Sequence, residues 1–128
     1  MAHPPLTPIG RPRDAVLDEK SFLANAKALA ERGQTLEERR ARVAGGWGEK
    51  YAQRVHEKGK LTARERLEQI KDEGTRTFEV GTFVNYERKF GKLEAPAAGV
   101  VTTFAQIHGR WVMVIANDNT VASGAWWP

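Results

Sequence analysis

The sequence predicts an α/β fold in which charged helices precede a β-hairpin. Two differences between residues 1–74 and residues 75–128 support this prediction. The first part holds 15 Lys/Arg and 12 Asp/Glu, whereas the second holds only 5 and 4. Eight of the 11 aromatic residues lie in the second part. A charged first part is typical of exposed helices, and an aromatic second part is typical of strands that need cover.

Three segments follow from these patterns. Residues 1–13 contain four of the six prolines and predict a flexible, extended arm. Residues 14–74 are the charged helical segment, and residues 75–128 hold the first strands of a domain. The net charge of +4 lies mainly on the helical segment, because Lys and Arg exceed Asp and Glu there by three.

Two helices are expected in the first half of the helical segment. The first runs from residue 14 or 18 to residue 32, where Gly33 is expected to end it. The second begins at Thr35, because Thr35 and Glu38 have the spacing of a capping box. Gly45-Gly46 is expected to end this second helix.

Two shorter helices are expected after the glycine pair. Glu49 to Glu57 forms the first, closed by Gly59. Thr62 and Glu65 repeat the capping-box spacing and predict the start of the next helix, Ala63 to about Asp72. The two capping boxes are the main support for the helical prediction.

The pattern changes to that of strands after Gly74. Thr77 to Phe83 is rich in β-branched and aromatic residues and predicts a strand, followed by a polar connection over residues 86–96. Val100 to Ile107 and Trp111 to Asn117 predict a hairpin around the turn His108-Gly109-Arg110.

The second strand of this hairpin is apolar on both faces and therefore needs cover on both sides. No strongly apolar helix follows it, and the last residues are Trp126-Trp127-Pro128. We therefore expect a truncated domain, with these residues belonging to a longer protein.

Several kinds of site are not expected. The chain has no Cys, which excludes disulfides and thiolate chemistry. Its longest apolar run, Trp111 to Ala116, is far shorter than the ~20 residues of a membrane-spanning helix, so direct membrane insertion is not expected. His3, His56 and His108 are too far apart to predict a metal site. The sequence shows no catalytic acid–base or nucleophile motif.

The basic residues of the helices raise a different possibility, a small protein that binds nucleic acid or an acidic partner. Glutamates are interleaved with them, which favours a solvated surface with local ion pairs. The basic residues are Arg39, Arg40, Arg42, Arg54, Lys58, Lys60, Arg64 and Arg66.

A turn-capping segment, residues 117–119, and then a candidate binding segment, residues 120–125, follow the hairpin. Asn117-Asp118-Asn119 is expected to cap a turn through side-chain bonds to local amides, in preference to binding calcium. Residues 120–125 are small and would let another backbone or a ligand approach closely.

Together these segments resemble the carboxyltransferase (β) subunits of biotin-dependent acyl-CoA carboxylases, over roughly residues 20–128. The paired aromatics before Pro128 are most similar to the methylcrotonyl-CoA carboxylase branch. The resemblance identifies the chain as the N-terminal portion of such a subunit. The segments that carry it are Gly45–Lys50, Gly59–Leu67, Ala95–Val101, His108–Arg110, Val114–Asp118 and Gly124–Pro128.

The resemblance implies the start of a crotonase-like (ClpP/crotonase) domain and an enzyme. Its reaction moves a carboxyl group between carboxybiotin and a short branched or unsaturated acyl-CoA through a CoA enolate. Backbone amides hold the enolate oxygen, so no catalytic side chain is required. In the family, the oxyanion-hole glycines and the biotin-binding domain lie beyond Pro128, so no catalytic residue is assigned and this piece alone is expected to be inactive.

The resemblance also supplies expected ligands and partners. Ser123, Gly124 and Ala125 are candidates for contact with coenzyme A. Arg64 and Lys60 are candidates for its phosphates, although helix capping and ion pairing with Glu65 and Glu68 are the favoured alternative for both. No metal site is assigned.

The expected partners are a biotin carboxylase/biotin carrier subunit, acyl-CoA and further copies of the full-length subunit, with no nucleic acid. A cytoplasmic or, in a eukaryote, mitochondrial matrix location is expected. The carboxyltransferase subunit of a sodium-pumping glutaconyl-CoA decarboxylase fits the residues equally well.

Overall fold

The computed structural model describes residues 9–128. The chain divides into two compact units, residues 1–37 and residues 38–128. Residues 1–8 of the predicted arm, which spans residues 1–13, lie outside the described residues. The first helix that is described is α1 (Arg13–Val16).

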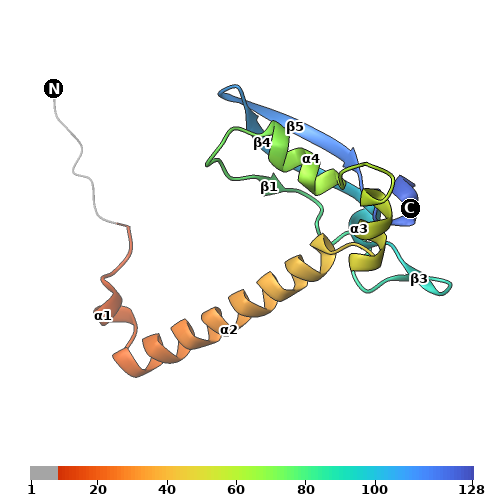
Figure 1. Cartoon of the computed structure of the whole chain (residues 1–128). Helices are drawn as coiled ribbons and strands as arrows, with labels where there is room; N and C mark the ends of the chain where they lie inside the picture. The colour runs from red at the N-terminus through yellow and green to blue at the C-terminus, as the bar shows by residue number, and fades with distance from the viewer. Residues whose placement is uncertain (1–8) are drawn as a thin grey trace. The chain divides into compact units, whose positions relative to one another are not determined.

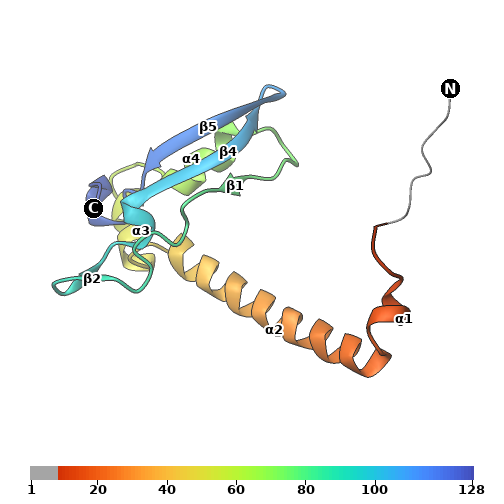
Figure 2. The same ribbon diagram turned by 180° about the vertical axis from the view of Figure 1, so that it is seen from behind.

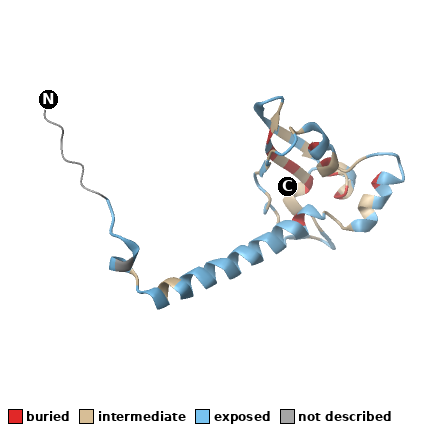
Figure 3. Cartoon of the chain, turned by 60° about the vertical axis from the view of Figure 1, so that its left-hand side comes forward, coloured by how far each residue is buried: buried red, intermediate tan, exposed pale blue. Residues whose placement is uncertain are grey.

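The first unit contains α1 and most of α2 (Glu19–Ala44). Asp18 lies directly before α2, and its carboxylate accepts hydrogen bonds from the Ser21 amide (3.0 Å) and hydroxyl (2.7 Å). These bonds lower the pKa of Asp18, the bond from the amide having the larger effect. The Arg13 guanidinium lies over the Phe22 ring, 4.4 Å from its centroid. Residues 23–37 of α2 are exposed (Figure 3).

The predicted break at Gly33 and the predicted capping box at Thr35 are wrong, because α2 continues through both. The Thr35 hydroxyl donates to the Glu31 carbonyl one turn earlier (3.0 Å) and so caps no helix start. A glycine inside a helix costs only about 1 kcal/mol relative to alanine, and the neighbouring Ala, Leu, Glu and Arg residues are strong helix formers.

The second unit begins with the end of α2 and continues with α3 (Glu49–His56) and α4 (Ala63–Ile70). The capping box predicted at the start of α4 is confirmed. The Thr62 hydroxyl accepts from the Glu65 amide (3.3 Å), and the Glu65 carboxylate accepts from the Thr62 amide (2.7 Å). This box fixes the residue at which α4 begins.

A three-stranded antiparallel sheet follows, with the order β1 (Phe78–Glu79), β4 (Val100–Ile107), β5 (Arg110–Asn117). The predicted hairpin is confirmed, with β5 starting one residue early. The turn residues His108 and Gly109 have positive φ angles of 50° and 74°, as a two-residue hairpin turn requires. Figures 1 and 2 show the long β4–β5 hairpin from its two sides.

Two parts of the strand prediction differ from the structure. The strand expected over residues 77–83 is reduced to β1, because Gly81 turns the chain with a φ of 73°. The polar connection contains an unpredicted hairpin, β2 (Lys89–Phe90) and β3 (Leu93–Glu94). Two tight turns complete the fold, η1 (Pro96–Gly99) and η2 (Ala122–Gly124), and both contain residues with left-handed backbone angles.

The core of the second unit lies between α4 and one face of the hairpin. Ala63 and Leu67 of α4 pack against Val101 and Ala105 of β4. The opposite face of the sheet is open, and its side chains include Phe78, Phe104, Trp111, Met113 and Ile115, which are all exposed. The α4 side of the hairpin is therefore covered, and the other side is not covered by residues 9–128.

None of the helices in residues 9–128 combines the length and the apolar character that crossing a membrane requires. The predicted arrangement of helices followed by a β-hairpin is confirmed.

Candidate functional site

Two left-handed turns lie at the same end of the β4–β5 hairpin. The first is Ala97, Ala98 and Gly99, with φ angles of 50°, 53° and 72°, and the second is residues 122–124, with 46°, 57° and 90°. A Cβ at Gly99 would lie 2.6 Å from the Ala125 carbonyl oxygen, so the two turns are in direct contact. Left-handed geometry costs a non-glycine residue about 1–2 kcal/mol. Such strain persists only where surrounding contacts hold it, and it is frequent at functional sites.

Asn117 and Asp118 hold the second turn. Asn117 Nδ2 donates to the Gly124 carbonyl (2.9 Å), and its Oδ1 accepts from the Trp126 indole (2.7 Å). The buried carboxylate of Asp118 accepts from the Thr120 amide (2.9 Å) and hydroxyl (2.6 Å). The predicted capping of this turn by bonds to local amides is therefore confirmed for Asp118.

Asn119 makes a different connection, to the start of α4. Its Oδ1 accepts from the Ala63 amide (3.2 Å), and its Nδ2 donates to the Leu61 carbonyl (2.9 Å). These partners lie 56 and 58 residues earlier in the chain, and no local pattern in the sequence points to them. Asn119 therefore ties the end of the hairpin to α4.

Arg64 forms a partly buried ion pair with Glu79. Its two terminal nitrogens donate to the two carboxylate oxygens at 2.7 and 2.9 Å. Burial opposes the charge of Arg64, but the bonds and charge of Glu79, with Asp118 nearby, raise its pKa above its usual value. Arg64 Nε is buried and has no hydrogen-bond partner.

The expected pairing of Arg64 with Glu65 and Glu68 is wrong. Glu65 pairs with His56, and Glu68 pairs with Lys71. Arg64 lies on α4 and Glu79 on β1, and both of these elements contact β4. The two side chains therefore meet although they are 15 residues apart in the sequence.

Arg64 also lines an open cavity of about 370 Å³. Residues of α3, of the start of α4 and of the turn after β5 surround it, among them His56, Asp118 and Thr120. His56 Nε2 lies 2.9 and 3.0 Å from the two Glu65 oxygens. The bond to His56 and the bonds from Thr62 lower the pKa of Glu65 to about 2.

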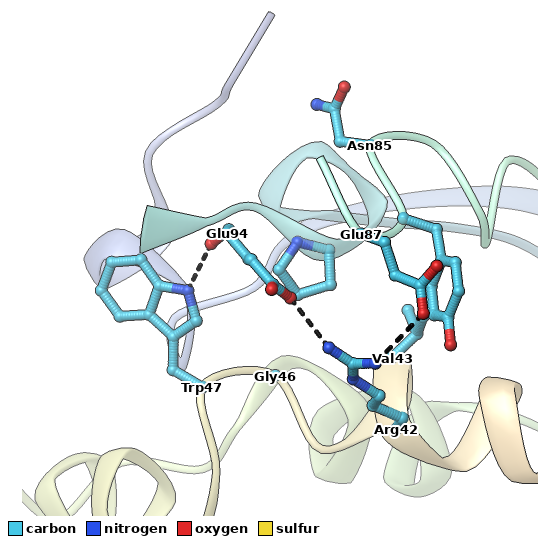
Figure 4. A pocket seen from close by; sticks show the side chains of 9 residues that line it. Arg42, Val43, Gly46, Trp47, Asn85, Glu87 and Glu94 are labelled. Carbon is cyan, nitrogen blue, oxygen red and sulfur yellow. Dashed lines mark hydrogen bonds and ion pairs between the residues drawn. The ribbon is translucent and has the colours of Figure 1, made fainter. Parts of the chain in front are cut away.

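A smaller cavity of about 60 Å³ lies between the end of α2 and the β2–β3 hairpin (Figure 4). Trp47 Nε1 donates to the Glu94 carbonyl (2.7 Å), and Arg42 pairs with Glu94 (3.1 Å) and Glu87 (3.4 Å). The charge of Glu94, more than any other group, raises the pKa of Arg42. The cavity has room for water only. The contacts around it hold the β2–β3 hairpin to the end of α2 and the loop that follows.

The predicted coenzyme A residues lie in two places. Ser123 and Gly124 lie in the turn after β5, residues 122–124, and Ala125 directly follows it. Ser123 and Ala125 are exposed. Arg64 lies on α4 and lines the 370 Å³ cavity, and Lys60 is exposed in the preceding loop. Within residues 9–128 no cluster of three or more His, Cys, Asp or Glu side chains could hold a metal ion.

Residues 54–128 match the carboxyl transferase domain family. The chain is 41% identical over 100 residues to methylmalonyl-CoA decarboxylase subunit alpha of Veillonella parvula, covering 76% of this chain and 19% of that protein. It is 36% identical over 93 residues to the mitochondrial methylcrotonoyl-CoA carboxylase beta chain of Dictyostelium discoideum, covering 73% and 16%. The chain thus spans less than a fifth of the length of these curated relatives.

The solved structure of transcarboxylase 12S with hydrolysed methylmalonyl-coenzyme A bound is also similar. Its TM-score is 0.65 at 37% identity, covering 73% of this chain and 19% of that one. Similar solved structures have the crotonase fold, which confirms the predicted fold class. The methylcrotonyl branch is not singled out, because relatives named for methylmalonyl-CoA are at least as similar. The chain belongs to the carboxyl transferase domain family.

Proposed function

We propose that this chain is part of a carboxyltransferase subunit that moves a carboxyl group between carboxybiotin and an acyl-CoA. The observation that carries the proposal is the match of residues 54–128 to the carboxyl transferase domain. The similar transcarboxylase 12S structure was solved with hydrolysed methylmalonyl-coenzyme A bound, which supports a CoA thioester as the substrate.

The turn after β5 is proposed as the part of this chain that contacts coenzyme A. Ser123 and Ala125 are exposed there, and the left-handed backbone is held by Asn117 and by contact with Gly99. A backbone fixed before the ligand arrives loses little entropy on binding. Biotin would reach the site on a partner subunit or domain, so no residue of this chain is proposed to hold it.

Arg64 is proposed as a second contact, with a CoA phosphate. Both of its terminal nitrogens are bonded to Glu79, so a phosphate would have to replace that carboxylate or share the guanidinium with it. Lys60 is exposed and is the alternative cation. If Arg64 binds phosphate, Arg64→Ala raises the KM for acyl-CoA, whereas Glu79→Gln, which frees the guanidinium, does not.

The substrate is proposed to be a short branched or unsaturated acyl-CoA. Relatives named for methylcrotonoyl-CoA, propionyl-CoA and methylmalonyl-CoA support this class. The second candidate is transfer in the reverse direction, within a decarboxylase. Two relatives named methylmalonyl-CoA decarboxylase subunit alpha favour this direction, at 41% and 38% identity. Their named substrate differs from glutaconyl-CoA, the decarboxylase substrate that the family resemblance suggested.

The proposed partners are a biotin carboxylase/biotin carrier subunit and further copies of the same subunit. The transcarboxylase 12S structure is described as a hexamer assembly, which supports a homo-oligomer. A cytoplasmic or mitochondrial matrix location is proposed, and the mitochondrial relatives support the second possibility in a eukaryote.

The test uses the complete subunit with a biotin carboxylase and a biotinylated carrier. Label from bicarbonate should enter an acyl-CoA in the presence of ATP, and avidin should abolish the incorporation. A decarboxylase subunit would instead move the labelled carboxyl group of methylmalonyl-CoA or glutaconyl-CoA to the biotinylated carrier without ATP, and avidin should again block this transfer. Absence of biotin-dependent transfer in both directions on a panel of short acyl-CoAs would overturn the proposal.

A further inference from the structure

Asn117, the last residue of β5, closes the loop that contains the second left-handed turn. Its Nδ2 donates to the Gly124 carbonyl at 2.9 Å, and its Oδ1 accepts from the Trp126 indole at 2.7 Å. A carbonyl can only accept and an indole N–H can only donate, so these partners fix which way the amide of Asn117 points. One side chain therefore bonds to groups seven and nine positions later in the chain.

The turn needs such a clamp because its own geometry is unfavourable. Ala122 and Ser123 have φ angles of 46° and 57°, in the region that L-residues with a Cβ rarely adopt. The backbone bonds within the turn, from Gly124 to Val121 (2.9 Å) and from Ala125 to Ala122 (3.2 Å), are local and move with it. The bond from Asn117 connects the turn to the end of a regular strand, which gives the turn a fixed position.

We propose that Asn117 is a positioning residue for the acyl-CoA substrate. It acts through the Gly124 carbonyl, which it holds so that the exposed Ser123 and Ala125 keep one arrangement toward coenzyme A. This inference rests on the proposed function of the turn. Asn117 itself is not assigned a contact with the substrate.

Asn119 provides a matched control. It is the same residue type two positions away, and its side chain also makes one bond as an acceptor and one as a donor. Its partners are the Ala63 amide and the Leu61 carbonyl at the start of α4, and not the turn. Asn119→Ala should therefore lower thermal stability but leave substrate binding as it is.

The experiment compares Asn117→Ala, Asn117→Asp and Asn119→Ala in the complete subunit with its biotin carboxylase and carrier. For Asn117→Ala we expect the KM for acyl-CoA to rise roughly 3- to 10-fold, the effect of losing the one bond, to the Gly124 carbonyl, that holds the turn. The kcat and the KM for the biotin carrier should stay within about twofold. Asn117→Asp keeps the acceptor for Trp126 and loses the donor to Gly124, so it should match the alanine variant.

The outcomes separate the inference from the proposed function. If the wild-type subunit transfers no carboxyl group, both fail. If it does, and the acyl-CoA KM of Asn117→Ala is unchanged or rises no more than that of Asn119→Ala at a similar loss of thermal stability, only the inference is overturned. If Asn117→Ala does not fold, the KM of Asn117→Asp decides the question in the same way.

Discussion

Gly46 lies so close to Thr120 that a side chain cannot fit between them. A Cβ built on Gly46 would overlap the Thr120 hydroxyl, which is buried and bonded to Asp118 (2.6 Å). Gly46 also has a φ of 55°. The backbone of the loop after α2 is therefore packed directly against the Thr120 side chain, in the segment that follows β5.

Substitution of Gly46 tests this contact. Gly46→Ala should destabilise the fold by about 2–5 kcal/mol, since it adds a steric clash to the about 1–2 kcal/mol cost of a left-handed alanine. Gly59→Ala is the control, because Gly59 has a φ of 65° but no atom within 4 Å of its Cβ position. Thermal unfolding followed by circular dichroism measures both, and equal losses would contradict the proposed clash.

Asp72 should control the stability of the β4–β5 hairpin. Its two carboxylate oxygens accept from the His108 and Gly109 amides, each at 2.7 Å. Asp72→Ala removes both bonds and should cost about 1–3 kcal/mol. Hydrogen exchange at the two amides should accelerate in the variant, whereas Glu73→Ala, at an exposed neighbouring carboxylate, should leave it unchanged.

Glu65 should make the start of α4 sensitive to acid. Its pKa is lowered from 4.5 to about 2 in the fold, by the bond to His56 and by bonds from Thr62. The ionised carboxylate therefore stabilises the fold above about pH 4.5, and this contribution is lost as the pH falls through about 2. Carboxyl NMR titration should place the midpoint near 2 in the wild type and closer to 4.5 in His56→Ala.

The acid effect has a direct control. Glu65→Gln should flatten the pH dependence of stability between about pH 4.5 and 2. Glu68→Gln, which alters an exposed carboxylate paired with Lys71, should keep the wild-type profile. A wild-type profile in Glu65→Gln would show that Glu65 does not link stability to pH.

The Arg64–Glu79 pair should show strong coupling in a double-mutant cycle. The side chains are only 27% and 21% exposed, and the contact is bidentate. We expect a coupling energy of about 1–3 kcal/mol between Arg64→Ala and Glu79→Ala, above the roughly 0.2–1 kcal/mol of exposed pairs. Chemical denaturation of the four proteins measures it, and the exposed pair of Arg42 and Glu87 is the comparison.

The open face of the sheet should drive association of the isolated 128-residue chain. Trp111 and Ile115 are 57% and 59% exposed, and Phe104 and Met113 lie beside them. Sedimentation should show self-association that Met113→Lys and Ile115→Lys together reduce. A monodisperse monomer would contradict this expectation.

The isolated chain should also show no carboxyl transfer, and measurable transfer would contradict this second expectation.

Local signals in the sequence predicted the elements that they control. The Thr62–Glu65 box and the turn at His108-Gly109 depend on residues within one turn of each other, and both appear as predicted. The box expected at Thr35 failed because Thr35 lies inside α2, where a hydroxyl bonds backwards to the preceding turn. Local spacing cannot distinguish a helix start from a helix interior.

Contacts over long sequence distances could not be predicted. Glu79 of β1 pairs with Arg64 of α4. Asn119 bonds to the start of α4, which lies 56 residues earlier in the chain. The small residues after β5 did indicate a turn at which another segment approaches closely, and Gly99 and Gly46 are the positions where this happens. No local sequence pattern distinguishes Asn117, whose side chain bonds to the turn, from Asn119, whose side chain bonds to α4.

The three residues at the end of β5 have a consequence for how this protein tolerates changes in length. Asn117, Asp118 and Asn119 bond in turn to the Gly124 carbonyl, to Thr120 and to the start of α4. Inserting or deleting one residue among them would change the spacing between these side chains, so that they could not all reach their partners. An insertion at Gly91-Lys92, in the exposed tip between β2 and β3, would disturb none of them. Length variants should therefore survive at that tip and be lost at residues 117–119.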